Sequence, residues 1–409
     1  MLLMRKLLVL PGHCTSMGGM TVSLALMVKG FERCGASEQI CVLVRANTLM
    51  EEYLVQAGHG ACLQPIQAKD QRQFTQLALQ WVNQQPRDWP LLLENCLTRQ
   101  VLLKIAIAAP ALRLAGRPVY YIFRDLALSY NRLGNLARNL AFACLAPRIL
   151  CNSKFTASYI HGRLGKVEEI LYPPVDTQKF NDRPSVPPKE LQPILDSGAK
   201  LMLTVSRISE PGKFNDKNLR ALIPVLARLR ATGHHYHAVV VGQDTSAGHT
   251  RTRALIEQAE SLGVADRFTV LPPTFAIEDY YKHADVVVTL APREPFGRTV
   301  VEAIACGVPV VGSRTGGIGE TLHHFAPQWA VDPNDPVAAA EAIIRIAGDS
   351  NTSDPIAEGK RWVETHCNTV NYARRTIAIV GLDSNQLRGT HTDLHRREEY
   401  SNLHLHKTQ

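Results

Sequence analysis

Two glutamates separated by seven residues, Glu294 and Glu302, carry the strongest chemical signal in the sequence. The proline after Glu294 favours an extended backbone there, and Gly297 allows the backbone to approach a ligand closely. The sequence therefore predicts a loop that carries Glu294, followed by a helix that begins near Arg298 and carries Glu302. The unpaired N–H groups at the start of such a helix attract anions such as a diphosphate.

The acids and the helix start together suit a phosphorylated sugar derivative. A carboxylate accepts two hydroxyl hydrogen bonds at once, as a ribose or sugar diol requires. The residues expected to bind this ligand, besides the two acids, are Phe296, Gly297, Arg298 and Thr299. The plainer alternative is that Glu294 is an exposed loop charge and that Glu302 only stabilises the first turns of its helix.

Three basic residues follow the apolar run Leu201–Val205 and form a second element of the expected site. Arg207 comes directly after this expected strand, where a side chain points into the ligand crevice of a parallel sheet and can bind phosphate bidentately. Lys213 and Lys217 each offer a further positive charge, and spacing leaves open which of them reaches the phosphates. Solvated surface charge is the alternative for each residue taken singly.

Glycine pairs mark two further turns between an expected strand and a helix. Gly316 and Gly317 form one pair, and Gly18 and Gly19 form the other, near the N-terminus. Both pairs allow backbone amides to face an anion, although ordinary strand-to-helix turns also use glycine. His13, in the N-terminal turn, is a candidate proton-handling group, with a structural role as the alternative.

The elements that must position these residues alternate between strands and helices. Continuous apolar runs indicate parallel strands that helices cover on both faces. The expected strands are Leu7–Leu10, Ile40–Val44, Leu91–Leu93, Val119–Phe123 and Arg148–Cys151 in the first half, and Leu201–Val205, Ala238–Gly242, Phe268–Leu271, Asp285–Leu290 and Val308–Val311 in the second. Amphipathic stretches lie between them, so we expect two doubly wound α/β sheets.

A proline-rich segment separates the halves and indicates a linker that resists helix formation. We expect an N-terminal Rossmann-like domain at residues 1–175, a linker at 176–198 and a C-terminal Rossmann-like domain at 199–355. A helical stretch follows at 356–382, and residues 383–409 have the composition of a disordered tail. The length of 409 residues suits two domains of this size.

The charge and the cysteine content of the chain limit the classes of ligand that it can bind and the cellular compartment in which we expect it. The formal net charge of +8 and the pI of about 9.0 favour anionic partners. Dispersed positive charge without interleaved aromatic residues argues against nucleic acid. The nine cysteines are scattered and include no Cys-x-x-Cys pair, which indicates neither a zinc site nor a redox motif. Their place within apolar runs indicates a reducing cytoplasm.

The sequence predicts no membrane span, because no uncharged apolar stretch reaches ~18–20 residues. The apolar run after Lys6 is shorter than the ~7–15 residues of a signal-peptide core and suits a first buried strand. Residues 132–148 form a basic amphipathic stretch. It predicts either peripheral contact with an anionic membrane or packing of its apolar face on the sheet.

Together these motifs resemble those of the family-4 retaining glycosyltransferases, which have the GT-B fold. The resemblance extends to about residue 380 and implies two Rossmann-like domains that face each other across a cleft, with a C-terminal helix that crosses back to the N-terminal domain. It rests on Glu294 with Glu302, Arg207 with Lys217, Gly316-Gly-Ile-Gly-Glu320, Tyr172-Pro-Pro-Val-Asp176 and Gly18-Gly19.

The resemblance also implies roles for the site residues. It places Glu294 by the donor sugar, Glu302 on the nucleotide ribose, and Arg207 with Lys217 on the diphosphate leaving group. It implies that a hexose-type sugar moves from a nucleotide diphosphate donor to a saccharide or lipid-linked acceptor, with retention of configuration. The chain contains no Asp-x-Asp motif, through which the alternative metal-dependent fold binds its cation. We therefore expect neither a metal nor another cofactor.

One departure from the family pattern concerns the acceptor side. Family members often carry a histidine after an N-terminal-domain strand, whereas Arg124 and Asp125 follow the run Val119–Phe123 here. Arg124, Asp125 and His13 are therefore the acceptor-side candidates. A nucleotide-sugar epimerase on the same fold and a non-catalytic nucleotide-sugar binding protein stay open as alternatives. We expect the protein in the cytoplasm, either free or peripheral at the inner membrane face.

Overall fold

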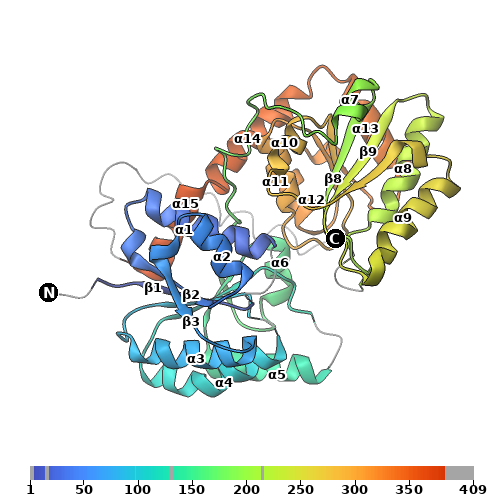
Figure 1. The fold of residues 1–409 in the computed structure, drawn as a ribbon. Coiled ribbons are helices and arrows are strands. Elements are labelled where there is room, and N and C mark those ends of the chain that lie inside the picture. The colour runs from blue at the N-terminus through green and yellow to red at the C-terminus, as the bar shows by residue number, and fades with distance from the viewer. Residues whose placement is uncertain (1–3, 14–17, 97, 129–131, 213–215, 383–409) are drawn as a thin grey trace.

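Two parallel sheets, one in each half of the chain, form the framework of the computed structural model (Figure 1). The structure describes residues 4–13, 18–96, 98–128, 132–212 and 216–382, so Lys213 and the expected tail at 383–409 lie outside the described residues. The first sheet has seven strands in the order β3-β2-β1-β4-β5-β6-β7, and the second has six in the order β10-β9-β8-β11-β12-β13. All pairings between these strands are parallel.

The N-terminal domain has helices on both faces of its sheet, with α1 and α2 on one face and α3, α4 and α5 on the other (Figure 1). Its strands are β1 (Leu7–Pro11), β2 (Ile40–Arg45), β3 (Leu63–Ile66), β4 (Leu91–Glu94), β5 (Val119–Phe123), β6 (Arg148–Cys151) and β7 (Val167–Ile170). Its helices are α1 (Gly19–Arg33), α2 (Leu49–Gln56), α3 (Gln71–Gln84), α4 (Arg99–Leu114), α5 (Arg132–Leu145) and α6 (Lys154–Ile160).

The C-terminal domain repeats this plan around its own core. Its strands are β8 (Lys200–Val205), β9 (Tyr236–Val241), β10 (Phe268–Leu271), β11 (Val286–Thr289), β12 (Val310–Ser313) and β13 (Ala330–Val331). Its helices are α7 (Gln192–Asp196), α8 (Leu222–Ala231), α9 (Thr250–Ser261), α10 (Ile277–Lys282), α11 (Arg298–Ala305), α12 (Gly316–His323), α13 (Pro336–Gly348) and α14 (Ser353–His366). Helix α7 lies within the expected linker, which therefore does contain one short helix; its proline occupies the first turn, where no N–H is needed.

A final helix, α15 (Thr369–Val380), returns to the N-terminal domain and packs on α1. The two helices approach closely at Gly30, where an added Cβ would lie 2.4 Å from the Thr369 carbonyl oxygen. Tyr372 and Ile377 are buried in the core of the N-terminal domain. This is the crossing helix that the GT-B resemblance implies. The expected single helical stretch at 356–382 is, however, two helices, α14 and α15, separated by Cys367 and Asn368. Within the described part of the chain, no helix combines the length and apolar character that crossing a membrane requires.

Candidate functional site

The Glu294 loop lies between β11 and α11, as the sequence predicts. The Glu294 carboxylate is half-buried and forms an ion pair with Lys217, with Nζ 2.5 Å from Oε2. Gly297 caps α11 with a left-handed φ of +86°, and an added Cβ would lie 2.7 Å from the Ile318 side chain. Glycine is therefore required at this turn for both its backbone conformation and the space around it.

Lys217 is fixed by its neighbour Asn218. The buried Asn218 amide donates hydrogen bonds to the carbonyl oxygens of Leu290 (3.2 Å) and Pro333 (2.7 Å). These bonds tie the Lys217 backbone to the end of β11, directly before the Glu294 loop. Asn218 was not among the predicted site residues, although asparagine tolerates the left-handed φ of 52° found there.

A cavity of about 120 Å³ opens at the carboxyl ends of β8 and β11. Parallel α/β sheets bind ligands at this edge. Five predicted residues line the cavity together: Arg207, Lys217, Glu294, Arg298 and Thr299. Three cations and one carboxylate thus surround a space at the start of α11, where an anionic group would meet both side-chain charges and backbone amides.

Glu302 lies one turn behind this cavity and is not part of its lining. Only 7% of its surface is exposed, its Oε1 is 2.7 Å from Arg298 Nε, and its Oε2 accepts a hydrogen bond from Tyr281 at 3.1 Å. Burial raises the pKa of Glu302, and the Arg298 charge partly offsets this. The structure thus places Glu302 where it orients Arg298, and its contact with a ribose stays a prediction.

Arg298 connects the two domains at the cavity. Its Nη1 donates to Ser23 Oγ on α1 (3.2 Å) and to the Pro174 carbonyl (3.0 Å), while its buried Nη2 has no hydrogen-bond partner among the described residues. Gly19, in the first turn of α1, lies close by, because an added Cβ would be 3.8 Å from the Arg298 side chain. The start of α1 therefore faces the start of α11. Gly18 is exposed, and a Cβ added to it would meet no described atom within 4 Å, so ligand contact by either glycine stays a prediction.

His13 approaches the same region from the N-terminal domain. Burial lowers its pKa, with Asp125 opposing this change and Arg207 adding to it. His13 comes two residues after β1, at the carboxyl edge of the N-terminal sheet. A lowered pKa keeps the imidazole neutral near pH 7, so one ring nitrogen is available to accept a proton.

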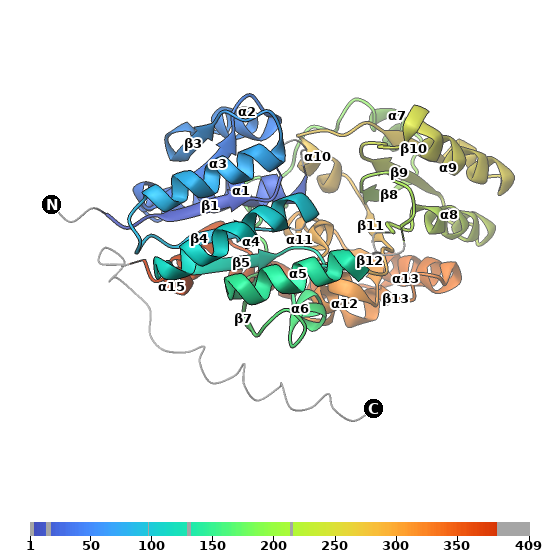
Figure 2. The same cartoon turned by 90° about the horizontal axis from the view of Figure 1, so that it is seen from below.

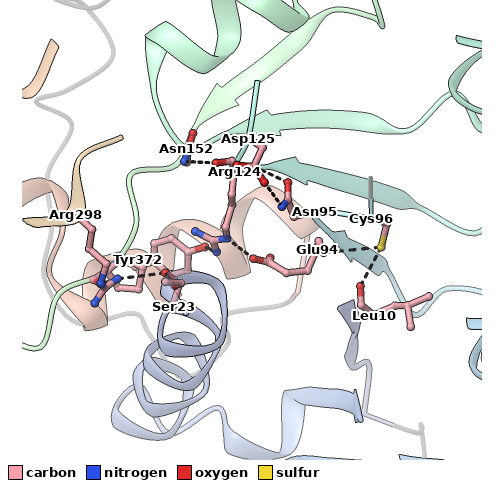
Figure 3. A network of polar contacts seen from close by, with 12 residues as sticks. Leu10, Ser23, Glu94, Asn95, Cys96, Arg124, Asp125, Asn152, Arg298 and Tyr372 are labelled. Carbon is pink, nitrogen blue, oxygen red and sulfur yellow. Dashed lines mark hydrogen bonds and ion pairs between the residues drawn. The ribbon is translucent and has the colours of Figure 1, made fainter. Parts of the chain in front are cut away.

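Arg124 lies in a buried polar network (Figure 3). Its guanidinium pairs with Glu94, which is fully buried at the end of β4, and donates to the Tyr372 hydroxyl on α15 at 3.2 Å. Burial opposes its positive charge, but Glu94 and Tyr372 leave the Arg124 pKa above the ordinary arginine value. Asp125 stays exposed and accepts a hydrogen bond from Asn95 at 2.8 Å. Of the two residues in place of the family histidine, the structure thus leaves only Asp125 accessible.

The remaining predicted residues lie within the Glu294 loop or pack against it. Phe296 is buried and packs on Tyr172, with ring centroids 5.8 Å apart. Gly316 and Gly317 are buried at the start of α12, where an added Cβ on Gly317 would lie 2.4 Å from the Pro295 carbonyl oxygen. The glycine pair therefore lets α12 pack against the loop backbone, and direct ligand contact by these residues stays a prediction.

Three further residues were missed by the sequence analysis: Tyr281, Glu94 and Tyr372. A glutamate that directly ends the apolar run Leu91–Leu93 was a usable signal, because a charge there needs a buried partner. The tyrosines gave no such signal, since their hydroxyl contacts depend on tertiary packing. Among the described residues, no three His, Cys, Asp or Glu side chains are arranged to hold a metal ion.

Sequence comparison agrees with this geometry. Residues 191–362 match the family described as "Glycosyl transferases group 1". The matched segment comprises most of the C-terminal domain. Among curated relatives, D-inositol 3-phosphate glycosyltransferase of Salinispora arenicola is 28% identical over 259 residues, covering 59% of this chain and 58% of that protein. The same enzyme of Rhodococcus opacus is 32% identical over 200 residues, covering 44% and 43%. The chain spans about half the length of the curated relatives it matches.

Solved structures of similar proteins share the complete two-domain fold. HepE of Anabaena, crystallised in complex with UDP-glucose, has a TM-score of 0.76 at 20% identity over 92% of this chain and 100% of that chain. Sucrose-phosphate synthase of Thermosynechococcus elongatus has a TM-score of 0.69 at 16% identity, over 92% and 98%. The predicted GT-B fold, with two Rossmann-like domains, is therefore confirmed.

Proposed function

We propose that this protein is a glycosyltransferase that moves a hexose-type sugar from a nucleotide diphosphate donor to a saccharide or lipid-linked acceptor, with retention of configuration. The observation that carries the proposal is the Lys217–Glu294 ion pair at the rim of a cavity that Arg207 and Arg298 also line. A diphosphate leaving group gains negative charge as its bond to the sugar breaks. Cations and helix amides fixed beside it stabilise that charge most in the transition state.

In this proposal the residues of the C-terminal domain have distinct tasks. Arg207 and Lys217 neutralise the diphosphate, and Arg298 adds a third cation at the start of α11. Glu294 holds the Lys217 ammonium and presents its carboxylate to the sugar hydroxyls. Since these side chains supply the positive charge, the proposal requires no metal or other cofactor. His13 and Asp125, from the N-terminal domain, occupy the acceptor side.

A thermal-shift panel of UDP, GDP, ADP and their sugars tests the proposal. One nucleotide should raise the midpoint of thermal unfolding above all others, because a ligand at ~100 times its Kd stabilises by about 2.7 kcal/mol. If no nucleotide or sugar nucleotide shifts the midpoint at millimolar concentration, the donor assignment is wrong. Product analysis with the stabilising donor alone separates the alternatives: an epimerase changes the sugar, whereas a binding protein leaves the donor intact with every acceptor tried.

A specific surface favours a membrane-associated acceptor. Helices α4 and α5 lie side by side on the outer face of the N-terminal domain (Figure 2). They carry six of the 14 exposed large apolar side chains in the described part of the chain, at helical spacing: Leu103, Ile107, Leu114, Leu133, Leu136 and Leu140. Neither helix contains an acidic residue, and Arg99, Lys104 and Arg113 lie on α4. An apolar stripe flanked by positive charge is complementary to an anionic lipid surface.

Vesicle flotation tests this surface. The protein should float with vesicles of phosphatidylcholine and phosphatidylglycerol at low salt and much less with phosphatidylcholine alone. Replacing Leu136 and Leu140 together by glutamate should weaken binding about tenfold or more, because two apolar contacts are lost and negative charge is added. Val186→Glu, at an exposed apolar site in the linker, is the control and should bind as the unmodified protein does. Equal binding by all three proteins would remove the membrane from the proposal.

A further inference from the structure

The loop that carries Glu294 is held from both domains. Within the C-terminal domain, the Glu294 carbonyl oxygen accepts a hydrogen bond from Gly317 N at 2.7 Å. From the N-terminal domain, Ser153 Oγ and Thr156 Oγ1 donate to the adjacent Pro295 carbonyl at 2.5 and 3.2 Å. Both hydroxyl residues are fully buried at the start of α6. The peptide next to the candidate catalytic acid is therefore bound by the opposite domain.

Glu320, on α12, makes the reciprocal contact from the C-terminal domain. Its Oε1 accepts from Lys154 N at 2.9 Å and from the Tyr172 hydroxyl at 3.0 Å, and its Oε2 accepts from Phe155 N at 2.7 Å. The first amides of a helix have no partner within the helix, so a carboxylate there is strongly favoured. Glu320 thus holds α6 in the position from which the Ser153 and Thr156 hydroxyls reach the Pro295 carbonyl oxygen. We refer to Ser153, Thr156 and Glu320 as the interdomain clamp.

The loop has little freedom between the two helices. The closest backbone approach to α12 occurs at Gly317, where even a methyl group would meet the Pro295 carbonyl oxygen at 2.4 Å. From the opposite side, the Ser153 and Thr156 hydroxyls donate hydrogen bonds to the same carbonyl oxygen. The Glu294 backbone is therefore fixed from two directions, and one of them exists only while the domains are in contact.

We propose that Ser153, Thr156 and Glu320 are positioning residues, which hold Glu294 in its working position only when the two domains are together. The inference rests on the proposed function, because it needs a reaction for Glu294 to serve. Arg207 and Lys217, which would bind the diphosphate, both belong to the C-terminal domain. Loss of the clamp therefore reduces turnover and leaves diphosphate binding intact.

Thr156→Val tests the clamp with almost no change of shape. With the sugar nucleotide that the panel of UDP-glucose, UDP-galactose, GDP-mannose and ADP-glucose identifies, kcat should fall about 10- to 100-fold. The Kd of the corresponding nucleoside diphosphate should stay within about twofold, because binding uses residues of one domain. Thr156→Ser retains the hydroxyl and should restore most of the turnover. Ser158→Ala, which removes an exposed hydroxyl bonded locally to the Phe155 carbonyl on the same helix, is the matched control.

A double-mutant cycle shows whether the clamp acts through Glu294. If it does, adding Thr156→Val to Glu294→Gln should change kcat by less than about twofold. Equal losses in both backgrounds, or a loss of diphosphate affinity as large as the loss of kcat, would show a general structural role and overturn the inference. If the unmodified protein turns over and Thr156→Val turns over at the same rate, the inference about the clamp is wrong and the proposed function stands. Absence of all turnover in the unmodified protein refutes the proposed function and the clamp with it.

Discussion

Replacing Glu294 by glutamine is expected to lower kcat by about 100- to 1000-fold, the range found when one polar group that acts in the transition state is removed. The substitution keeps the size of the side chain but removes the negative charge that pairs with Lys217. The ammonium then loses its fixed position beside the leaving group, and the sugar hydroxyls lose a carboxylate acceptor. Steady-state rates with the stabilising sugar nucleotide and calorimetric binding of the diphosphate measure the two effects separately.

Diphosphate affinity should change far less than kcat in this variant, because Arg207 and Arg298 still line the cavity. Glu341→Gln is the control, since it makes the same chemical change at an exposed site on α13 of the same domain. It should turn over at the unmodified rate. If Glu294→Gln retains more than about a third of that rate, Glu294 does not take part in the reaction as proposed.

Replacing Glu94 by glutamine is expected to lower the free energy of unfolding by about 3–5 kcal/mol, because it leaves the Arg124 charge buried without its carboxylate. Glu94 is fully buried and Arg124 is 9% exposed, so water cannot replace the lost partner. The midpoint of urea unfolding measures the loss. The double variant Glu94→Leu with Arg124→Met, which removes both charges, should recover much of it.

Asp88→Asn provides the matched comparison at an exposed ion pair. Asp88 pairs with Arg5 at 3.3 Å, and the Asp88 side chain is 59% exposed and that of Arg5 33% exposed. Exposed pairs contribute about 0–1 kcal/mol, so the urea midpoint should hardly move. Similar midpoints for Glu94→Gln and Asp88→Asn would mean that the buried network contributes nothing particular to stability.

The central strands were predictable because they are continuous apolar runs, whereas three strands at the sheet edges were not. β3 contains Pro65, and β7 has two adjacent glutamates, so neither shows the apolar pattern of a buried strand. β13 has only two residues. Edge strands lack a partner on one side, and their sequences reflect exposure rather than pairing.

At the candidate site, the sequence predicted which residues gather but not how they are oriented. Arg207, Lys217 and Glu294 follow strands or lie in strand-to-helix loops, so the topology of a parallel sheet brings them to one edge. Tyr281 donates a hydrogen bond to the buried Glu302 carboxylate. Glu94 and Tyr372 bind the buried Arg124 guanidinium. These partners are distant in sequence, and no local pattern connects them.

The return of α15 to the N-terminal domain makes that domain discontinuous in sequence. Tyr372, Ala373, Ile377, Val380 and Leu382 complete a core whose other members precede residue 172. The last segment of this core is therefore synthesised only after the whole C-terminal domain. We infer that the C-terminal domain can complete its folding before the N-terminal domain does. Until α15 is synthesised, the surface of α1 that it covers stays exposed.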